Sequence, residues 1–533
     1  MELADIERCC CVVTLSKAFS AKKSVSCSGV IVHPPSGTIL CTGLPFSRFT
    51  ANKKYLNTNG RVLPAHRFSK NLRINVTLSS QLDMNQCAQV NNNNNNNTSR
   101  TSQPDTSANL LMLVNCSQFR HAFQSVFPES HQWRFYGDED QEEEMLKDAQ
   151  FLSWFAVLKA KDLHTSSFPQ LVPWLDSSSL LKGGPVVACG TPFGSLCVDL
   201  FTSTLSRGII SNLTGQENAI ILTDARCLPG TEGGGLFALE SPEKVRLVGV
   251  VVSPFGWKAN EWIGLSLVCS IHLIFKSILQ FTKPENPLQD VVLRREKELC
   301  MVPTTAGHEA SLVQQPTVCL VDSGQFWGSG VLVSSRLALT CRHVVNGKST
   351  VMLKFRQKDR FSDVVGDVLF STREDSPYDL AVVKLRDGVG QAVLPQMSQR
   401  FCAGEPVLVV GYGAIGRSCG PSLTSGVLSK SISTKEQRPV MLQTTCAVQA
   451  GTSGGAVIRP QSGELLGIVS SNTKDFATNV TYPHLNFSIP VSVFEKMLLL
   501  FTQTHDVSVF KELDSADEDV RRVWRLQSPS SKL

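Results

Sequence analysis

The chain has 533 residues, of which 42% are hydrophobic and 18% are charged, and its formal net charge is +5 at pH 7. At roughly 150 residues per domain this length predicts two to four domains, and the ordinary hydrophobic content excludes a largely disordered protein. A charge of +5 over such a length is too small to indicate a nucleic-acid or membrane partner, so neither is expected.

The N-terminal segment and the cysteines indicate the compartment. Residues 1–7 are acidic where a secretory signal is basic, and no run of eighteen apolar residues predicts a membrane span. The 17 cysteines cannot all pair with one another, and none has C-x-x-C spacing. We therefore expect free thiols in a reducing compartment, with no metal site and no cofactor.

Two regions of the chain align with each other. Residues 223–234 match residues 444–455 at an offset of 221, and residues 27–32 match residues 328–333 at an offset of 301. The extra length in the first copy includes the asparagine-rich segment 85–108, which is expected to be a flexible insertion. Both copies consist of short β-branched runs broken by Gly, Ser and Pro, so the predicted fold class is all-β, with one fold present twice.

This repeat divides the chain into four predicted segments. We expect the first copy over residues 1–285, a linker over 286–312, the second copy over 313–505 and a tail over 506–533. The linker is polar and begins close to two prolines, Pro284 just before it and Pro287 inside it, as boundaries between domains often do. A helical pattern is confined to places such as residues 491–501.

Three residues of the second copy have the types that nucleophilic acyl transfer needs. His343 follows one predicted strand, Asp379 begins another, and Ser453 lies in the glycine-rich turn 451–455. A serine becomes a strong nucleophile when an imidazole accepts its proton, and an aspartate fixes the tautomer of that imidazole. The glycines allow the N–H groups of Gly451 and Ser453 to point at a developing oxyanion. Together these residues predict a Ser-His-Asp triad.

The same serine motif also fits the nucleophile elbow of an α/β-hydrolase, in which His484 or His505 would be the base. In that fold a helix follows the serine. Here the residues after Ser453 predict a strand that ends at Pro460. The sequence therefore favours the all-β alternative.

The last three residues, Ser531, Lys532 and Leu533, form the tripeptide that the peroxisomal import receptor reads. Such a match at this position rarely arises by chance. We therefore expect a protein of the peroxisomal matrix that has the import receptor as one partner.

The motifs T-x-x-H, D-L-A-V-V-K-L and G-x-S-G-G, in this order, resemble those of the trypsin-like serine peptidases, specifically of their Deg/HtrA-like branch. With the C-terminal tripeptide and the altered first copy, the chain resembles the peroxisomal leader peptide-processing proteases. The resemblance implies a trypsin-like double β-barrel in each copy. It also implies that His343 is the general base, Asp379 its orienting partner and Ser453 the nucleophile, with Gly451 and Ser453 forming the oxyanion hole.

The resemblance also implies where a peptide binds. Ser470, Ser471 and Asn472 would lie beside the substrate as an antiparallel strand, and Ala447 would lie at the base of the primary specificity pocket. Thr452 replaces the aspartate with which trypsin-like zymogens bind a new N-terminus, so that mode of activation is not expected. No carboxylate is expected at the pocket floor, and the side chain of Asn472 would narrow the pocket. We therefore expect cleavage after small or uncharged residues such as cysteine.

The first copy lacks all three catalytic residues. Glu232 replaces the serine, Trp154 stands where the aspartate belongs, and Gly43 and Leu44 fall where the histidine should be. This copy is predicted to be catalytically inactive. It is either a scaffold for substrate, for the active copy or for dimer formation, or a relic that is kept for stability.

The expected function is therefore that of a serine endopeptidase. It would remove N-terminal leader peptides from imported matrix enzymes, process such enzymes, and form homodimers or other homo-oligomers. Self-cleavage is expected near the insertion, where Cys87 and Cys116 offer small uncharged residues. The alternative is a non-catalytic peptide-binding or chaperone-like protein of the same fold.

Overall fold

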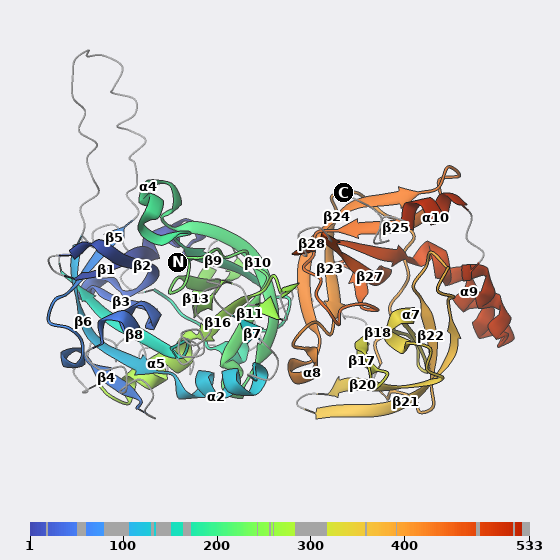
Figure 1. Ribbon diagram of the computed structural model, residues 1–533, viewed down its shortest axis with the longest axis horizontal. Coiled ribbons are helices and arrows are strands. Elements are labelled where there is room, and N and C mark those ends of the chain that lie inside the picture. Colours follow the sequence, from blue (N-terminus) through green and yellow to red (C-terminus); the bar gives the residue numbers. More distant parts are fainter. Residues whose placement is uncertain are drawn as a thin grey trace, which may run out of the picture.

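The computed structural model describes the following parts of the chain: residues 1–17, 20–50, 60–78, 106–128, 133–134, 151–161, 163, 172–241, 244–254, 257–258, 261–282, 317–357, 360–390, 392–475, 480–514 and 518–524. Strands dominate, and they form two halves that lie side by side (Figure 1). The described residues up to 282 are called the N-terminal half, and those from 317 onward the C-terminal half.

Two rings of antiparallel strands form the N-terminal half. In the first ring β6 pairs with both β5 and β8, which closes a barrel of β1 (Cys10–Lys17), β2 (Ser20–His33), β3 (Thr38–Thr42), β5 (Leu72–Leu78), β6 (Thr106–Asn115) and β8 (Trp154–Ala160). The short strand β4 (Val62–Pro64) pairs with β6 and extends the sheet beyond the ring. The second ring is a closed barrel made of β9 (Pro185–Gly190), β10 (Thr204–Thr214), β11 (Ile220–Thr223), β12 (Gly235–Ser241), β13 (Lys244–Ser253) and β16 (Ser266–Ser270). A small sheet of β7 (Trp133–Arg134), β14 (Trp257–Lys258) and β15 (Glu261–Trp262) lies outside the rings.

The C-terminal half repeats this plan with two closed barrels. The first consists of β17 (Val318–Asp322), β18 (Trp327–Ser334), β19 (Leu337–Thr340), β20 (Thr350–Gln357), β21 (Arg360–Ser371) and β22 (Ala381–Leu385). The second consists of β23 (Pro406–Gly411), β24 (Ser422–Ser433), β25 (Pro439–Thr444), β26 (Ala456–Ile458), β27 (Leu465–Asp475) and β28 (Val480–Pro490). The prediction of an all-β fold with a double barrel in each copy is confirmed.

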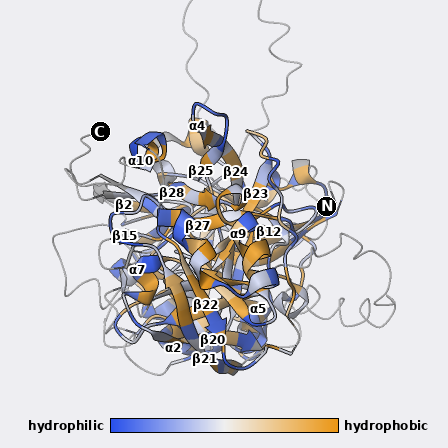
Figure 2. Ribbon diagram, turned by 90° about the vertical axis from the view of Figure 1, so that its right-hand side faces the viewer, coloured by the Kyte–Doolittle hydropathy of each residue, from blue (hydrophilic) through white to orange (hydrophobic). Residues whose placement is uncertain are grey.

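Apolar side chains from the short β-branched runs fill the barrels. In β22, for example, only Lys384 is exposed, while the two valines and the leucine are buried. Figure 2, which faces the C-terminal half, shows hydrophobic residues concentrated in the strand-rich interior. The cysteines whose side chains the structure describes are free thiols, and all but Cys402 are buried. Among the described residues, no helix has both the length and the apolar content needed to cross a bilayer.

The helices are more numerous than the sequence analysis expected. The predicted helix near 491–501 is α9 (Val491–Thr504), but α2 (Ser117–Val126) and α5 (Ile271–Leu279) were missed. In α2 the buried residues follow helical spacing and face the core, namely Phe119, Ala122, Phe123 and Val126. The remaining α-helices are short: α4 (Val198–Phe201), α7 (Arg342–Val345), α8 (Gly416–Cys419) and α10 (Glu518–Trp524).

Part of the predicted tail packs against the C-terminal half. A 3-10 helix, η12 (Val507–Asp514), buries Phe510, and α10 buries Trp524. The indole N–H of Trp524 donates a hydrogen bond to the carbonyl of Val440 over 3.1 Å. The described part of this segment therefore belongs to the folded core.

The two halves contact each other through their second barrels, with β10 against β24 (Figure 1). The buried carboxylate of Asp224 accepts hydrogen bonds from the backbone N–H of Ser425 over 2.5 Å and from its hydroxyl over 2.7 Å. Within its own half it accepts one from the N–H of Ile209 over 2.7 Å. Nearby, the Asn212 amide donates to the Ser422 hydroxyl over 2.9 Å. These polar contacts fix how the barrels meet.

Asp224→Ala is expected to destabilise the protein measurably, because it leaves the partly buried backbone N–H groups of Ile209 and Ser425 without their carboxylate acceptor. An unpaired donor costs at most about 1–3 kcal/mol when it is fully buried. Denaturant unfolding of the full chain measures the loss, with the exposed Asp387→Ala as the control. Unfolding midpoints equal to wild type in both variants would contradict this role for Asp224.

Candidate active site

His343 and Asp379 meet at the edge of the first C-terminal barrel. His343 lies in the short helix α7, directly after β19, and Asp379 lies two residues before β22, which pairs with β19. The Nδ1 atom of His343 is 2.5 Å from Oδ2 of Asp379, and the backbone N–H of His343 donates to Oδ1 over 3.0 Å. Both carboxylate oxygens are therefore engaged by one residue, which fixes the orientation of the imidazole.

Asp379 is mostly buried, and burial alone would raise its pKa. The hydrogen bonds from His343 and the positive charges of His343 and Arg342 outweigh burial and hold the pKa of Asp379 below its usual value. The Arg342 guanidinium contributes from 3.9 Å. The carboxylate is therefore ionised near neutral pH, as a partner for an imidazolium must be.

Ser453 lies in a turn that is held against the first barrel. The carbonyl of Ser453 accepts a hydrogen bond from the N–H of Ser329 in β18 over 2.8 Å. The N–H of Gly454 donates to the carbonyl of Val469 in β27 over 2.7 Å. A Cβ on Gly454, whose φ is +86°, would lie 2.0 Å from the Ser329 carbonyl oxygen. Only glycine fits at this contact between the two barrels.

The predicted oxyanion loop has a second brace that the sequence analysis missed. The hydroxyl of Ser329 donates to the carbonyl of Gly451 over 2.7 Å and accepts from the N–H of Tyr412 over 2.7 Å. Gly451 has a φ of +91°, and a Cβ there would overlap Trp327. The repeat could have indicated Ser329, since it aligns with Ser28 in the first copy.

The three predicted triad residues are not all hydrogen-bonded to one another. In the part of the chain that the structure describes, His343 and Asp379 are bonded, but no hydrogen bond links the Ser453 hydroxyl to His343. Bonds of this kind are often long before substrate binds. Two contacts bring Ser453 to the site. One is the hydrogen bond from Ser329, and the other is the close packing of Gly454, where an added Cβ would lie 2.7 Å from the hydroxyl of Thr340 at the end of β19.

The predicted substrate-binding residues lie on one side of this turn. Ser470, Ser471 and Asn472 are in β27. The preceding residue of that strand, Val469, accepts the N–H of Gly454 and donates its own N–H to the carbonyl of Gly455, directly after Ser453. Ala447 is buried, with 3% exposure. The amide of Asn472 is 3.5 Å from the carbonyl of Val448, so this side chain points toward the loop that carries Ala447.

Cys341 lies next to the histidine. Its sulfur, a ring nitrogen of His343 and a carboxylate oxygen of Asp379 lie within 4.8 Å of one another, a grouping that could hold a metal ion. Burial and the charge of Asp379 raise the pKa of the Cys341 thiol well above its usual value. The protonated thiol donates to the carbonyl of Val469 over 3.2 Å. Cys341 thus serves as a small buried donor, while His343 and Asp379 bind each other.

The N-terminal half retains the hydrogen-bond frame of this turn without its chemistry. The N–H of Ser28 donates to the carbonyl of Glu232 over 2.9 Å, and its hydroxyl donates to the carbonyl of Gly230 over 2.8 Å. The N–H of Gly233 donates to the carbonyl of Val251 over 2.8 Å. Each bond has the counterpart described above for the C-terminal half. The duplication therefore extends to the nucleophile loop.

The residues at the triad positions of the N-terminal half cannot catalyse. Strand pairing aligns Trp154, which is buried, with Asp379, and the carbonyl of Trp154 accepts the N–H of Gly43 over 2.7 Å. Glu232 occupies the serine position, and its carboxylate accepts the N–H of Gly230 over 2.7 Å. Desolvation raises the pKa of Glu232 to about 7. The counterpart of the oxyanion donor is thus occupied by the protein's own side chain.

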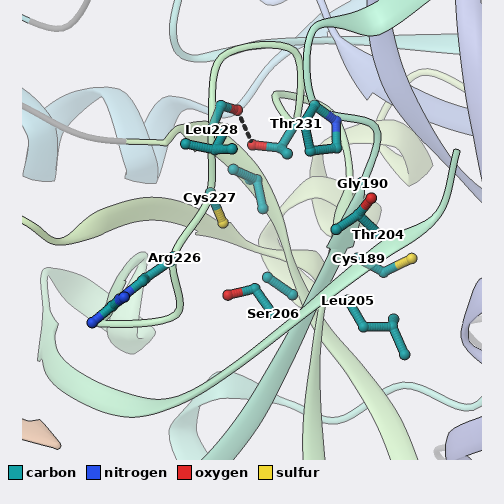
Figure 3. A pocket seen from close by; sticks show the side chains of 12 residues that line it. Cys189, Gly190, Thr204, Leu205, Ser206, Arg226, Cys227, Leu228 and Thr231 are labelled. Carbon is teal, nitrogen blue, oxygen red and sulfur yellow. Dashed lines mark hydrogen bonds between the residues drawn. The ribbon is translucent and has the colours of Figure 1, made fainter. Parts of the chain in front are cut away.

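A cavity of about 130 Å³ lies behind this loop in the N-terminal half (Figure 3). The hydroxyl of Thr231 donates to the carbonyl of Leu228 across one wall, over 2.6 Å. Arg226 lines the cavity and aligns with Ala447 at the offset of the repeat. An arginine therefore stands where the C-terminal half has the alanine of the predicted specificity pocket.

The structure describes one of the two predicted self-cleavage residues and none of the targeting tripeptide. Cys87 and the tripeptide 531–533 lie outside the described residues. Cys116 was expected to be accessible beside the insertion, and this expectation is wrong. It follows β6 and is fully buried at the start of α2, because residues 106–115 pair with two strands of the barrel.

Among known proteins, some match only the C-terminal half of this chain and others match nearly all of it. The family profile of the trypsin-like peptidase domain matches residues 328–468. The mouse peroxisomal leader peptide-processing protease is 39% identical, and the alignment covers 99% of this chain and 97% of that protein. The human protein of that name is 38% identical, with 98% and 96% covered. The serine endoprotease DegS of Haemophilus influenzae is 29% identical over 32% of this chain and 48% of that protein.

The mouse and human alignments run through both halves, so they include the inactive copy as well as the copy with the triad motifs. Identity at this level over nearly the whole length establishes common descent and a common fold. The chain therefore belongs to the family of peroxisomal leader peptide-processing proteases, and it is a trypsin-like serine endopeptidase of the peroxisome.

Proposed function

We propose that His343, Asp379 and Ser453 form the catalytic triad of an endopeptidase that removes leader peptides from proteins imported into the peroxisome. The observation that carries the proposal is the double engagement of Asp379 by His343, through the ring nitrogen and the backbone N–H. An imidazole held in this way has its other ring nitrogen free to accept a proton.

The reaction proceeds through an acyl-enzyme. The Ser453 hydroxyl attacks the scissile carbonyl carbon while its proton passes to Nε2 of His343, and Asp379 stabilises the imidazolium. The N–H groups of Gly451 and Ser453 donate to the oxyanion of the tetrahedral intermediate. His343 then gives its proton to the leaving amine. A water molecule, deprotonated in turn by His343, releases the acyl group and restores Ser453.

The specificity pocket is proposed to accept small or uncharged side chains. The buried methyl group of Ala447 supplies no charge at the pocket base, and the amide of Asn472 points at the same loop. Ser470 and Ser471 offer the backbone of β27 as a strand partner for the substrate. Residues such as alanine and cysteine fit these properties, whereas lysine and arginine would lack a counter-charge.

Several further points are proposals on the same basis. The mouse and human relatives are named for processing peroxisomal leader peptides, which supports leader-bearing enzymes as substrates. We also propose that the import receptor reads residues 531–533 and that the chain cleaves itself at Cys87. The chain is further proposed to form homo-oligomers and to be divided by a linker at residues 286–312.

A peptide library tests the proposed function. The purified full chain is expected to cut after small uncharged residues, to leave Lys and Arg sites intact, and to release the leader from a leader-bearing matrix enzyme. A fluorophosphonate probe is expected to label Ser453. A chain that binds such peptides without cutting them or taking up the probe would instead be the non-catalytic, chaperone-like alternative.

A further inference from the structure

A segment of the N-terminal half lies against the residues of the proposed specificity pocket. Gly264 follows β15 and has a φ of +71°. A Cβ on Gly264 would lie 3.3 Å from Cγ of Pro483 and 3.5 Å from both Cβ of Ala447 and Nε2 of His484. The three residues that Gly264 contacts all belong to the C-terminal half. The inactive copy therefore reaches the outer side of the pocket base.

Trp262 makes a second contact from the same segment. Its ring packs edge to face with the ring of His484, with 6.0 Å between centroids. Nδ1 of His484 is 3.2 Å from the carbonyl of Thr445, two residues before Ala447. The preceding carbonyl, of Pro483, accepts the N–H of Val448 over 2.9 Å. β28 is thus tied to the loop of Ala447 on one side and to Trp262 on the other.

The segment is anchored by apolar contacts. Ile263 and Leu265, on either side of Gly264, are both buried and form a cluster with Ala414 of the C-terminal half. β15 itself pairs with β14, which pairs with β7. Residues 262–265 are therefore fixed on both flanks, and Gly264 lies beside Pro483, Ala447 and His484.

The charges nearby favour a neutral pocket wall. Burial and the positive charge of Arg226, also from the N-terminal half, lower the pKa of His484, while its bond to Thr445 and the carboxylate of Asp224 act in the opposite direction. The net effect keeps the imidazole uncharged at pH 7. A neutral wall suits the uncharged substrate residues proposed above.

We propose that Trp262 and Gly264 of the inactive N-terminal half are positioning residues for the specificity pocket of the active half. They hold Ala447, Pro483 and His484 at the spacing that limits the pocket to small side chains. This inference rests on the proposed function, because it takes Ala447 as the pocket base. It gives the inactive copy a role in substrate selection that the C-terminal half does not supply alone.

The two positions predict opposite changes in selectivity. Gly264→Ala adds a methyl group close to Cγ of Pro483 and in van der Waals contact with Ala447 and His484, at a φ that alanine rarely adopts. The strained segment is expected to shift against β28 and to move His484 and Ala447 toward the substrate. A misfit of one methylene in a pocket changes kcat/KM by about 10-fold to 200-fold. We expect at least a tenfold loss for a cysteine at the cleavage site, mainly through KM. Trp262→Leu removes the support of His484 and is expected to improve cleavage after leucine and methionine relative to alanine.

The test uses the full chain and peptides that differ only in the residue before the cleaved bond. Gly404→Ala is the matched control, because Gly404 also has a positive φ, of +86°, but no neighbour within 4 Å of an added Cβ. It should leave selectivity unchanged. The double variant Gly264→Ala/Ala447→Gly lacks the methyl group that faces the added one, so its activity should be close to that of Ala447→Gly alone. Trp262→Phe should retain the wild-type selectivity profile.

Fluorophosphonate labelling separates the possible failures. If the wild-type chain is not labelled, the proposed function itself is wrong. If all variants are labelled at wild-type rates but Gly264→Ala and Trp262→Leu keep the wild-type selectivity, the positioning role is overturned and the proposed function stands. Should Gly264→Ala fail to fold, the comparison of Trp262→Leu with Trp262→Phe decides the matter, since neither introduces backbone strain.

Discussion

Ser453→Ala is expected to reduce the rate of leader removal to the background. In a triad the serine, its base and the orienting carboxylate act as a unit, and loss of the nucleophile costs about 10⁶-fold in kcat. The methyl group leaves the backbone bond from Ser329 to the carbonyl of residue 453 in place, so the turn should keep its shape. Substrate affinity and the unfolding midpoint should therefore match those of the wild-type chain.

The control for this variant is Glu232→Ala, at the aligned position of the N-terminal half. Because Trp154 stands at the aspartate position there and Gly43 and Leu44 fall at the histidine position, this change should leave peptide cleavage unaltered. Single-turnover kinetics on a leader-bearing substrate measure both variants. Undiminished cleavage by Ser453→Ala would place the nucleophile elsewhere in the chain and would remove the mechanism proposed above.

Local patterns in the sequence predicted the barrels and the contexts of the triad residues. The runs before His343 and after Asp379 form β19 and β22, and these strands pair as a trypsin-like barrel requires. The repeat also indicated correctly that Trp154 takes the place of the aspartate. These predictions succeeded because strand periodicity and glycine-rich turns are encoded by residues close together in the chain.

Contacts between distant segments could not be predicted in this way. The hydroxyl of Ser329 reaches Gly451 across 122 residues, and Asp224 reaches Ser425 across 201. Such bonds depend on how barrels pack, which no local pattern specifies. Cys116 illustrates the same limit, because low complexity before it suggested exposure, whereas pairing of β6 with β8 buries it. The helix α2, by contrast, has a local pattern that was overlooked.

Asp379→Asn is expected to lower kcat by about 10⁴-fold with little change in KM, because it supplies the wrong hydrogen-bond partner to the imidazole. An asparagine can still accept the backbone N–H of His343 through Oδ1, so the helix start is preserved. Its NH₂ group, however, would donate to Nδ1 of the ring and place the ring proton on the nitrogen that must accept from Ser453. Peptide cleavage under saturating substrate measures the loss. Asp367→Asn, at an exposed ion pair with Arg386, is the control and should retain full activity.

The pH dependence distinguishes this catalytic role from a purely structural one. The pKa of Asp379 is held below its usual value, so its ionised form favours the folded state above the unfolded-state pKa, and this contribution is lost as pH falls through the lowered pKa. The stability gap between wild type and Asp379→Asn should therefore close in acid. The activity gap should instead narrow at high pH, where hydroxide can remove the serine proton and the imidazole is needed less. A constant activity ratio across pH, following stability alone, would show that Asp379 only supports the fold.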